Sequence, residues 1–570
     1  MFFVLPPNGQ IKNLSYLRMS INVAYKESSR ALTLPRFFKR GRPWLWLFIL
    51  LIAGSLAQIG IGQRELFNPA GLPLTGQFFA AAFAPARDAD ILALTFTSSL
   101  ITLAYAVCGV AVSLVIGIGG GILSSEVWWL AHARGASTRA PWVVTRALLA
   151  APRAMHEVIW GLFFINLFGL DPLVAILALG IPFGATTAKV YGEILDETPR
   201  APLYALLHAG TAPHTAFLYT LLPQAAPQLL SYAFYRFECA LRAAAVLGLI
   251  GAGGLGFQIL LSLQALNYDE LWTFLYALCV LSALTDLWSS QVRLALEARG
   301  AHAANSFTLK PRWTSLFLKM SLLAALLLIP GSFIVVAANF GKLVEPRTFE
   351  LLADLAARSV PPNLDAARLP KLFFLAAQTL AMSALAIALA GGIGILTSYF
   401  AARNLMRSPF ERVTLILTRA LLLLWRAIPA PIWALLCLFV FFPGILPGAI
   451  AIAIHNAGVL GRLMAETIEN ANARPLRALT ALGAPKAQAV LYGVMPLTLP
   501  QSLAYTLYRW EVGVRETVVV GMVGAGGLGL LLQEQLSSFD YRGIIVTLFA
   551  FFVLTFIVDV MSASARKALR

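Results

Sequence analysis

Long apolar runs alternate with short polar segments along almost the whole chain. Each run is continuous, whereas the strands of a membrane barrel alternate apolar and polar positions. Most runs reach the about 20 apolar residues that a helix needs to cross a bilayer. The pattern therefore predicts an all-α integral membrane protein with about twelve transmembrane helices, at residues 44–62, 97–123, 142–168, 173–191, 229–261, 271–292, 320–339, 372–400, 413–442, 445–464, 503–532 and 544–561.

Composition supports a membrane location. Of the 570 residues, 59% are hydrophobic and 12% are charged, compared with about 25% charged residues in soluble proteins. The net charge of +16 comes largely from basic residues beside the runs, such as Arg403, Arg407 and Arg412, where the positive-inside rule places cytoplasmic loops. There is no basic and aromatic patch of the kind that nucleic-acid binding needs. We therefore expect membrane lipid, and no nucleic acid, as a partner.

The sequence offers no basis for an enzyme. The four cysteines lie inside apolar runs without CxxC spacing, which is typical of buried apolar residues and not of disulfides or metal ligands; they are Cys108, Cys239, Cys279 and Cys437. No phosphate-binding GxxxxGK[ST] loop occurs in the sequence, so no cofactor is expected on this chain. Residues 1–40 lack a signal-peptide pattern and are expected to be a poorly ordered cytoplasmic leader, with Met19 as an alternative start.

The chain contains a tandem duplication. Adding 273 to the residue number carries RAMHEVIW at 153–160 onto RAIPAPIW at 426–433, and 14 of the 28 positions in 229–256 are identical to their partners. We predict two repeats, residues 41–300 (the first half) and 301–570 (the second half). Each repeat has six spans, so both enter the membrane from the same side and are related by a pseudo-twofold axis along the membrane normal.

Three ionisable residues recur within one apolar segment of each repeat, Arg236, Glu238 and Arg242, and Arg509, Glu511 and Arg515. Ionisable groups at membrane depth cost free energy unless they are paired or face water. Two alternatives remain open. In one, Glu238 and Arg242 form a structural pair one helical turn apart while Arg236 reaches the cytoplasmic interface. In the other, some of the arginines line a pathway and attract an anion.

A second set of arginines is spaced by seven residues, Arg146 with Arg153 and Arg419 with Arg426. This spacing places each pair on nearly one helix face. Arg153 and Arg426 could face each other as a cationic ring that selects anions, or these arginines could bond to carbonyls at helix ends. The repeats differ just beyond them, with His156 and Glu157 in one and Pro429 and Ala430 in the other.

Two further features are interpreted structurally. Lys189 with Glu193 and Arg462 with Glu466 are spaced as intrahelical pairs. The GAGGLG block at 251–256 and 524–529 has no strand-helix-strand context for dinucleotide binding. We expect it to form a tight turn or a close helix contact at the outer face.

A glycine-centred stretch recurs at 203–223 and 476–496, LYALLHAGTAPHTAFLYTLLP and LRALTALGAPKAQAVLYGVMP. In each copy a proline follows 13 residues after the glycine. Helix-forming Ala and Leu, a turn at Gly and a helix-starting Pro predict a short helix, a turn and a second helix. The stretch resembles the EAA loop of ABC-importer permeases, which couples the permease to an ATPase. The residues expected to carry this role are Tyr204, Ala205, Gly210, Pro223, Arg477, Ala478, Gly483 and Pro496.

Together with the YR-x-E-x3-R and GAGGLG blocks, these segments resemble the permease of phosphonate-uptake ABC transporters, duplicated and fused. The resemblance implies a type I importer fold in the bacterial inner membrane, a cytoplasmic ATPase dimer that holds ATP and Mg, and a periplasmic or lipid-anchored substrate-binding protein. It also implies phosphonate, phosphite or phosphate as substrate. Where the family's loop has a leading glutamate, this chain has Tyr204 and Arg477, so docking would rest on shape and apolar contact.

The candidate pathway residues are all ionisable and occur in equivalent pairs: Arg153, Arg426, Arg236, Glu238, Arg242, Arg509, Glu511 and Arg515. No catalytic residue and no metal site is expected. Two alternatives remain, an ion-gradient-driven secondary transporter with parallel halves and an ABC permease for another small solute.

Overall fold

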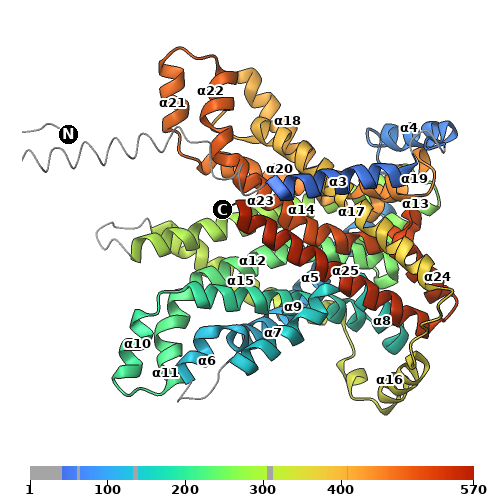
Figure 1. Ribbon diagram of the computed structural model, residues 1–570, viewed down its shortest axis with the longest axis horizontal. Coiled ribbons are helices and arrows are strands. Elements are labelled where there is room, and N and C mark those ends of the chain that lie inside the picture. Colours follow the sequence, from blue (N-terminus) through green and yellow to red (C-terminus); the bar gives the residue numbers. More distant parts are fainter. Residues whose placement is uncertain (1–41, 61–64, 133–138, 304–311, 407, 570) are drawn as a thin grey trace, which may run out of the picture.

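The computed structural model describes residues 42–60, 65–132, 139–303, 312–406 and 408–569. These ranges form helices, together with one isolated antiparallel bridge between Phe67 and Phe441. The all-α prediction is therefore confirmed for the described residues (Figure 1). The expected leader at 1–40 lies outside them.

Most helices of the first half have a counterpart in the second. The first half contains α3 (Arg42–Ile59), α4 (Leu72–Ala81), α5 (Ala89–Ser124), α6 (Glu126–His132), α7 (Arg139–Ala154), α8 (Glu157–Phe168), α9 (Pro172–Glu197), α10 (Ala201–His208), α11 (Pro213–Ala216), α12 (Leu222–Leu247), α13 (Gly254–Gln264) and α14 (Tyr268–Ala303). The second contains α15 (Arg312–Val336), α16 (Pro346–Ser359), α17 (Leu369–Ala401), α18 (Pro409–Ala427), α19 (Ala430–Val440), α20 (Ile445–Asn470), α21 (Arg474–Ala481), α22 (Lys486–Gly493), α23 (Met495–Val520), α24 (Gly527–Ser537) and α25 (Tyr541–Leu569). Short 3-10 turns, η1 (Pro69–Gly71) and η4 (Phe340–Leu343), and π turns, η2 (Phe217–Leu221), η3 (Gly248–Ala252) and η5 (Gly521–Ala525), connect them.

The described helices supply the expected number of spans, although four of them are broken. Seven helices are long and apolar enough to cross a membrane, and four bent helix pairs bring the number to 11. The shorter apolar helix α3 would be the twelfth. The sequence predicted continuous spans at 142–168, 229–261, 413–442 and 503–532, and this is wrong: the chain bends there by 84°, 58°, 95° and 63°.

Each bend has a local cause. A residue in extended conformation separates the two helices at two of the bends. It is His156, with ψ of 148°, before α8, and Pro429, also with ψ of 148°, before α19. At the GAGGLG blocks, glycines adopt positive φ, for example Gly251 at 95° and Gly524 at 111°. Side-chain-bearing L residues avoid this region, so the expected tight turn is confirmed.

The first helix of each half packs on the other half. In α3, Phe48 lies edge-on to Trp510 of α23, with ring centroids 5.3 Å apart. In α15, Leu328 and Ile329 pack against the buried cluster that contains Val110 of α5. The two halves therefore exchange their first helices, which an apolar pattern does not reveal because it does not specify a packing partner.

Glycines allow α5 to lie very close to α9. A Cβ on Gly117 would come within 2.5 Å of Thr187, and one on Gly121 within 2.6 Å of Tyr191. Helix α5 is continuous through these glycines. The glycines of this stretch therefore serve close helix packing and do not break the helix.

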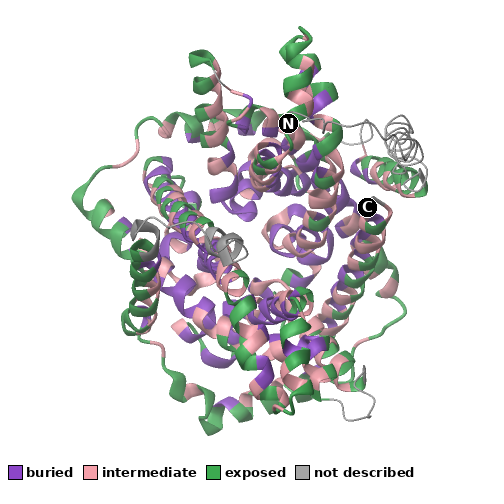
Figure 2. Ribbon diagram, turned by 90° about the vertical axis from the view of Figure 1, so that its left-hand side faces the viewer, coloured by how far each residue is buried: buried purple, intermediate pink, exposed green. Residues whose placement is uncertain are grey.

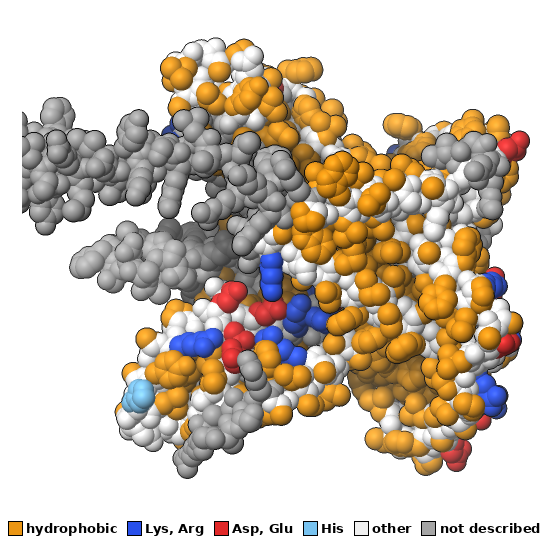
Figure 3. Space-filling model, in the orientation of Figure 1, with side chains coloured by type: hydrophobic (Ala, Val, Ile, Leu, Met, Phe, Trp, Pro, Cys, Tyr) orange, Lys and Arg blue, Asp and Glu red, His pale blue; other side chains and the backbone are white. Residues whose placement is uncertain are grey.

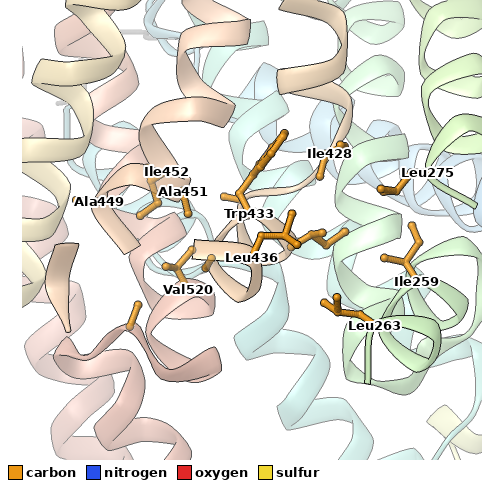
Figure 4. Packing of buried hydrophobic residues seen from close by; sticks show 14 of the residues in the cluster. Ile259, Leu263, Leu275, Ile428, Trp433, Leu436, Ala449, Ala451, Ile452 and Val520 are labelled. Atoms are coloured by element: carbon orange, nitrogen blue, oxygen red, sulfur yellow. The ribbon is translucent and has the colours of Figure 1, made fainter. Parts of the chain in front are cut away.

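Helix α19 packs against both halves. Figure 4 shows Trp433 and Leu436 of this helix between Ile452 of the second half and Ile259 of the first. All four belong to one buried apolar cluster. Viewed from one end, buried residues concentrate on the inner sides of the helices and exposed ones on the circumference (Figure 2), as expected for a protein whose outer surface contacts lipid.

The two ends of the molecule differ in shape. Helices α10 and α11 and helices α21 and α22 project from the same end, at opposite corners, whereas α4 and α16 lie at the other end (Figure 1). A mostly hydrophobic surface lies between them, and charged side chains gather in the hollow between the projecting parts and along the opposite edge (Figure 3). This arrangement agrees with two parallel halves.

An ion pair ties the halves together in the loop that follows α8. Lys342 of η4 lies 2.8 Å from Asp171, whose other oxygen accepts a hydrogen bond from the Leu173 N–H and caps α9. Burial raises the pKa of the Asp171 carboxyl, but the bond from Lys342 and the backbone N–H groups outweigh burial and hold this pKa below its ordinary value.

We predict that Asp171→Asn, which retains a capping side chain, lowers the free energy of unfolding by about 1 kcal/mol at pH 7 through loss of the ion pair. Because the folded carboxyl has a lowered pKa, its contribution is complete above the ordinary pKa of about 3.9 and disappears as pH falls through the lower folded value. Thermal unfolding of both proteins from pH 7 to pH 3 tests this prediction. A difference that grows on acidification would contradict it.

Candidate functional site

A cavity of about 170 Å³ with several charged residues in its lining lies between the two halves, near the bends at which α8 and α19 begin. Its walls come from α8, α9 and α12 and from their counterparts α19, α20 and α23. Four arginines and two glutamates line it, which gives a formal charge of +2 when the two lining histidines are neutral (4 − 2). These ionisable residues are Arg236, Arg242, Arg509, Arg515, Glu157, Glu516, His156 and His455.

The four arginines of the two YR blocks are thus brought to one cavity. The expectation that Arg236 reaches the cytoplasmic interface is wrong. Its side chain is 9% exposed and its guanidinium stacks on Phe183, 3.8 Å from the ring centroid. Arg242 lies 3.9 Å from Glu238, as expected for a pair one turn apart.

Glu238 is not among the described residues that line the cavity. It lies instead at the centre of a cluster of ion pairs. Besides Arg242, it lies 3.2 Å from Arg293 of α14 and 3.5 Å from Arg426 of α18. Arg462 of α20 is 3.8 Å away. The carboxylate of Glu511, the equivalent residue, has one close cationic partner among the described residues, Arg566 at 2.6 Å.

Arg153 and Arg426 do not form the expected cationic ring. Neither is among the described residues that line the cavity. Arg426 donates to Asp286 of α14, and Arg153 lies 4.0 Å from Asp559 of α25. These two carboxylates are equivalent (286 + 273 = 559), and each arginine pairs with the carboxylate of the other half. A buried cation needs such a counter-charge, and the aspartates provide it here.

The alternative of bonds to helix-end carbonyls is confirmed for the other two arginines. The Arg146 Nε donates to the Ser124 carbonyl at 3.1 Å, and the Arg419 Nε donates to the Ala401 carbonyl at 2.9 Å. Ser124 and Ala401 end α5 and α17. Arg146 also pairs with Asp196 at 3.3 Å.

The predicted intrahelical pairs are confirmed as well. Lys189 lies 3.8 Å from Glu193, and Arg462 lies 3.0 Å from Glu466. Arg462 is shared, since it also donates to Asp286 at 2.9 Å.

Sequence reasoning overlooked several residues at the site. Glu516 lines the cavity, and Asn456 donates a hydrogen bond to it at 2.6 Å. His455, for which the sequence indicates no symmetric role because Pro182 occupies the equivalent position, lines the cavity as well. Asp286 and Asp559 were overlooked although they are carboxylates within apolar runs, which is by itself a signal of function. Glu516 could have been found as a difference between the repeats, because its equivalent is Ala243.

The bends direct the beginnings of two helices toward this cavity. His156 begins α8 by accepting a hydrogen bond from the Val158 N–H, and both His156 and Glu157 line the cavity. Pro429 and Ala430 line it at the equivalent start of α19. Helix beginnings carry a partial positive charge, which adds to that of the arginines.

The glycine-centred stretches form the expected short helix, turn and second helix. Gly210 and Gly483 have φ of 85° and 83°. Their N–H groups bond to Leu207 and Thr480, so each glycine ends its helix in the left-handed conformation that favours glycine. Pro223 and Pro496 lie in the first turns of α12 and α23.

The end of α21 presents an exposed surface. Leu482 at its end is 84% exposed, and Arg477 and Ala478 within the helix are exposed. Tyr204 and Ala205 of α10 are exposed as well. This geometry is compatible with docking to a further protein.

Comparison with known proteins places the chain in a family. Residues 394–570 match the family described as the binding-protein-dependent transport system inner membrane component. A phosphite transport system permease protein of Stutzerimonas stutzeri is 33% identical over 218 residues, which is 38% of this chain and 77% of that protein. A putative cryptic phosphonate transport system permease protein of Escherichia coli is 38% identical over 118 residues, 21% of this chain and 97% of that protein.

Similarity also extends over both halves. A phosphate-import permease protein of Mycolicibacterium smegmatis is 29% identical over 431 residues, which covers 75% of this chain and 78% of that protein. With its apolar spans, its parallel halves and its polar cavity, the chain belongs to the family of inner membrane permease components of binding-protein-dependent ABC importers and is a multi-pass protein of the bacterial inner membrane.

Proposed function

We propose that the chain is the transmembrane subunit of an ATP-driven importer for phosphonate, phosphite or phosphate. The observation that carries this proposal is the cavity between the halves, where four arginines outnumber two glutamates. A net positive cavity attracts anions. The printed names of the relatives, which are phosphate, phosphite and phosphonate permeases, support the same substrate class.

Within this proposal, Arg236, Arg242, Arg509 and Arg515 line the cavity through which the anion passes. The other four candidates, Glu238, Glu511, Arg153 and Arg426, act from outside the cavity. For example, the Arg153 carbonyl accepts a hydrogen bond from Arg515 at 2.8 Å. These four residues position the cavity arginines, and Glu238 also balances the charge of Arg242.

We further propose that an ATPase dimer, which binds ATP and Mg, docks on the projecting helices α10 and α21. The contact residues would be Tyr204, Ala205, Gly210, Pro223, Arg477, Ala478, Gly483 and Pro496. The halves 41–300 and 301–570 would each receive one ATPase subunit, and a periplasmic or lipid-anchored binding protein would deliver the anion at the opposite end. Family membership favours this scheme over a gradient-driven transporter, since such importers depend on a binding protein.

Reconstitution tests the proposal. The tagged full chain would be purified from membranes together with its ATPase and placed in liposomes with the binding protein. We expect uptake of labelled phosphate, phosphite or methylphosphonate that requires ATP and persists after a protonophore collapses the proton gradient. Uptake driven by an ion gradient without the ATPase would refute the mechanism. Uptake restricted to a cation or a neutral solute would refute the substrate class.

A further inference from the structure

Equivalent arginines of the two halves have different surroundings in the cavity. Arg236 and Arg509 are related by the offset of 273 residues and both line the cavity. The first half has Phe183 and Ala243 where the second half has Asn456 and Glu516. The partners of the two guanidinium groups therefore differ in charge.

Side chains of the second half bind the Arg509 guanidinium and neutralise its charge. Its Nη2 lies 3.1 Å from the Glu516 Oε1, and its Nε donates to the Asn456 Oδ1 at 2.7 Å. Asn456 in turn donates to the other oxygen of Glu516 at 2.6 Å. These three side chains close a ring of hydrogen bonds, so Arg509 already has the carboxylate partner that a guanidinium prefers.

Arg236 has no such partner among the described residues. Its side chain is nine-tenths buried, its Nε is buried without a hydrogen-bond partner, and its guanidinium contacts the face of Phe183. Neither Phe183 nor Ala243 can accept a hydrogen bond through its side chain. A buried cation in this condition lacks the compensation that buried charges require.

The two remaining arginines of the cavity are partly satisfied. Arg242 lies beside Glu238 and donates to the Cys239 sulfur at 3.6 Å. Arg515 donates to the Glu511 carbonyl at 3.3 Å and to the Arg153 carbonyl at 2.8 Å. Arg236 is therefore the least compensated of the four.

Free hydroxyl groups accompany Arg236. Tyr232 and Tyr235 lie three residues apart on α12, with ring centroids 5.8 Å apart, and both line the cavity. Within the described residues, neither hydroxyl has a hydrogen-bond partner. A guanidinium and phenolic hydroxyls together offer the donors that the oxygens of a tetrahedral oxyanion accept.

We propose that the site is asymmetric: Arg236, with Tyr232 and Tyr235, binds the phosphorus oxyanion, while Arg509 is kept from it by Glu516. This inference rests on the proposed function. It adds that only the first half of the duplicated protein binds the anion. The anion provides the counter-charge that Arg236 lacks. Glu516 prevents a second equivalent site and leaves one anion for each transport cycle.

Introducing the carboxylate of Glu516 at the equivalent position of the first half tests the asymmetry. Ala243→Glu places a carboxylate at the position equivalent to Glu516, and Ala243→Gln has nearly the same shape without the charge. In the reconstituted complex, with inorganic phosphate as the probe, we expect Ala243→Glu to lower uptake on the order of tenfold or more relative to Ala243→Gln, because the new carboxylate competes for Arg236.

Arginine variants provide a second and independent test. We expect Arg236→Gln to lower phosphate uptake on the order of tenfold, with partial recovery in Arg236→Lys, while stimulation of ATP hydrolysis by the loaded binding protein persists. The double variant Arg509→Gln and Glu516→Gln removes both charges of the neutral pair. It should retain far more uptake than Arg236→Gln does.

The outcomes separate the two hypotheses. If the unsubstituted complex takes up none of the three oxyanions, the proposed function fails and this inference fails with it. If the unsubstituted complex transports phosphate but Ala243→Glu and Ala243→Gln behave alike, or Arg236→Gln and the double variant lose uptake equally, the asymmetric site alone is refuted.

Discussion

Replacement of Gly483 by valine is expected to uncouple transport from ATP hydrolysis while the permease remains folded. Gly483 ends α21 with φ of 83°, a conformation that costs a β-branched residue about 1–3 kcal/mol. A Cβ at this position meets no atom within 4 Å, so the strain is confined to the backbone of the turn. The variant should therefore fold and insert normally but hold α21 in an altered orientation.

The expected loss follows from the size of the strain. A penalty of about 1–3 kcal/mol on the docked orientation corresponds to a factor of about 5–150 in coupling. The measurement is ATP-dependent uptake in proteoliposomes, together with the elution profile and thermal unfolding of the purified permease.

Asparagine provides the matched control, because it tolerates the left-handed conformation. Gly483→Asn should retain most of the transport. Normal uptake by Gly483→Val, or equal loss in both variants, would refute a coupling role for this turn. The same pair of substitutions at Gly210, where φ is 85°, tests whether the two halves contribute equally.

The features that sequence could predict are those encoded locally. The spans follow from continuous apolar runs, and the turn glycines from a helix-breaking residue between helix formers. The duplication follows from a constant offset, which placed Arg236 and Arg509 in equivalent positions before any fold was known. Each of these features depends on residues close together in sequence or on direct comparison of two segments.

The features that sequence missed depend on contacts between distant helices. The two helices of each bent span together have the hydropathy of one membrane-crossing helix, so hydropathy does not reveal the bend. The sequences of α3 and α15 do not indicate that each helix packs against the other half. Arg426 was expected to face its counterpart, but it meets Asp286, 140 residues away. Only tertiary packing brings these two side chains together.

A difference between the repeats was more informative than their identity. Matching positions revealed the arginines, but the chemistry of the cavity depends on the mismatches, Phe183 with Asn456 and Ala243 with Glu516. Duplication supplies two equivalent sets of residues. Substitution in one set can then change its charge without altering the shared helical framework.

Replacement of Glu238 by glutamine is expected to produce the largest loss of stability. Glu238 lies within 4 Å of four arginines, two from its own half, Arg242 and Arg293, and two from the other, Arg426 and Arg462. Its side chain is 7% exposed. Loss of the carboxylate leaves buried cations facing one another, and breaking a buried ion pair in this way costs about 3–5 kcal/mol.

Glu511→Gln provides the matched comparison, because Glu511 occupies the equivalent position and, in the part of the chain that the structure describes, forms one close ion pair, with Arg566 at 2.6 Å. We expect a cost of about 1–3 kcal/mol for that variant. Thermal unfolding of both purified variants measures the difference. Equal shifts would show that the second-half arginines do not depend on Glu238 for their counter-charge. A larger shift for Glu238→Gln would instead identify this carboxylate as an electrostatic link between the halves, because within the described residues it lies within 4 Å of arginines from both.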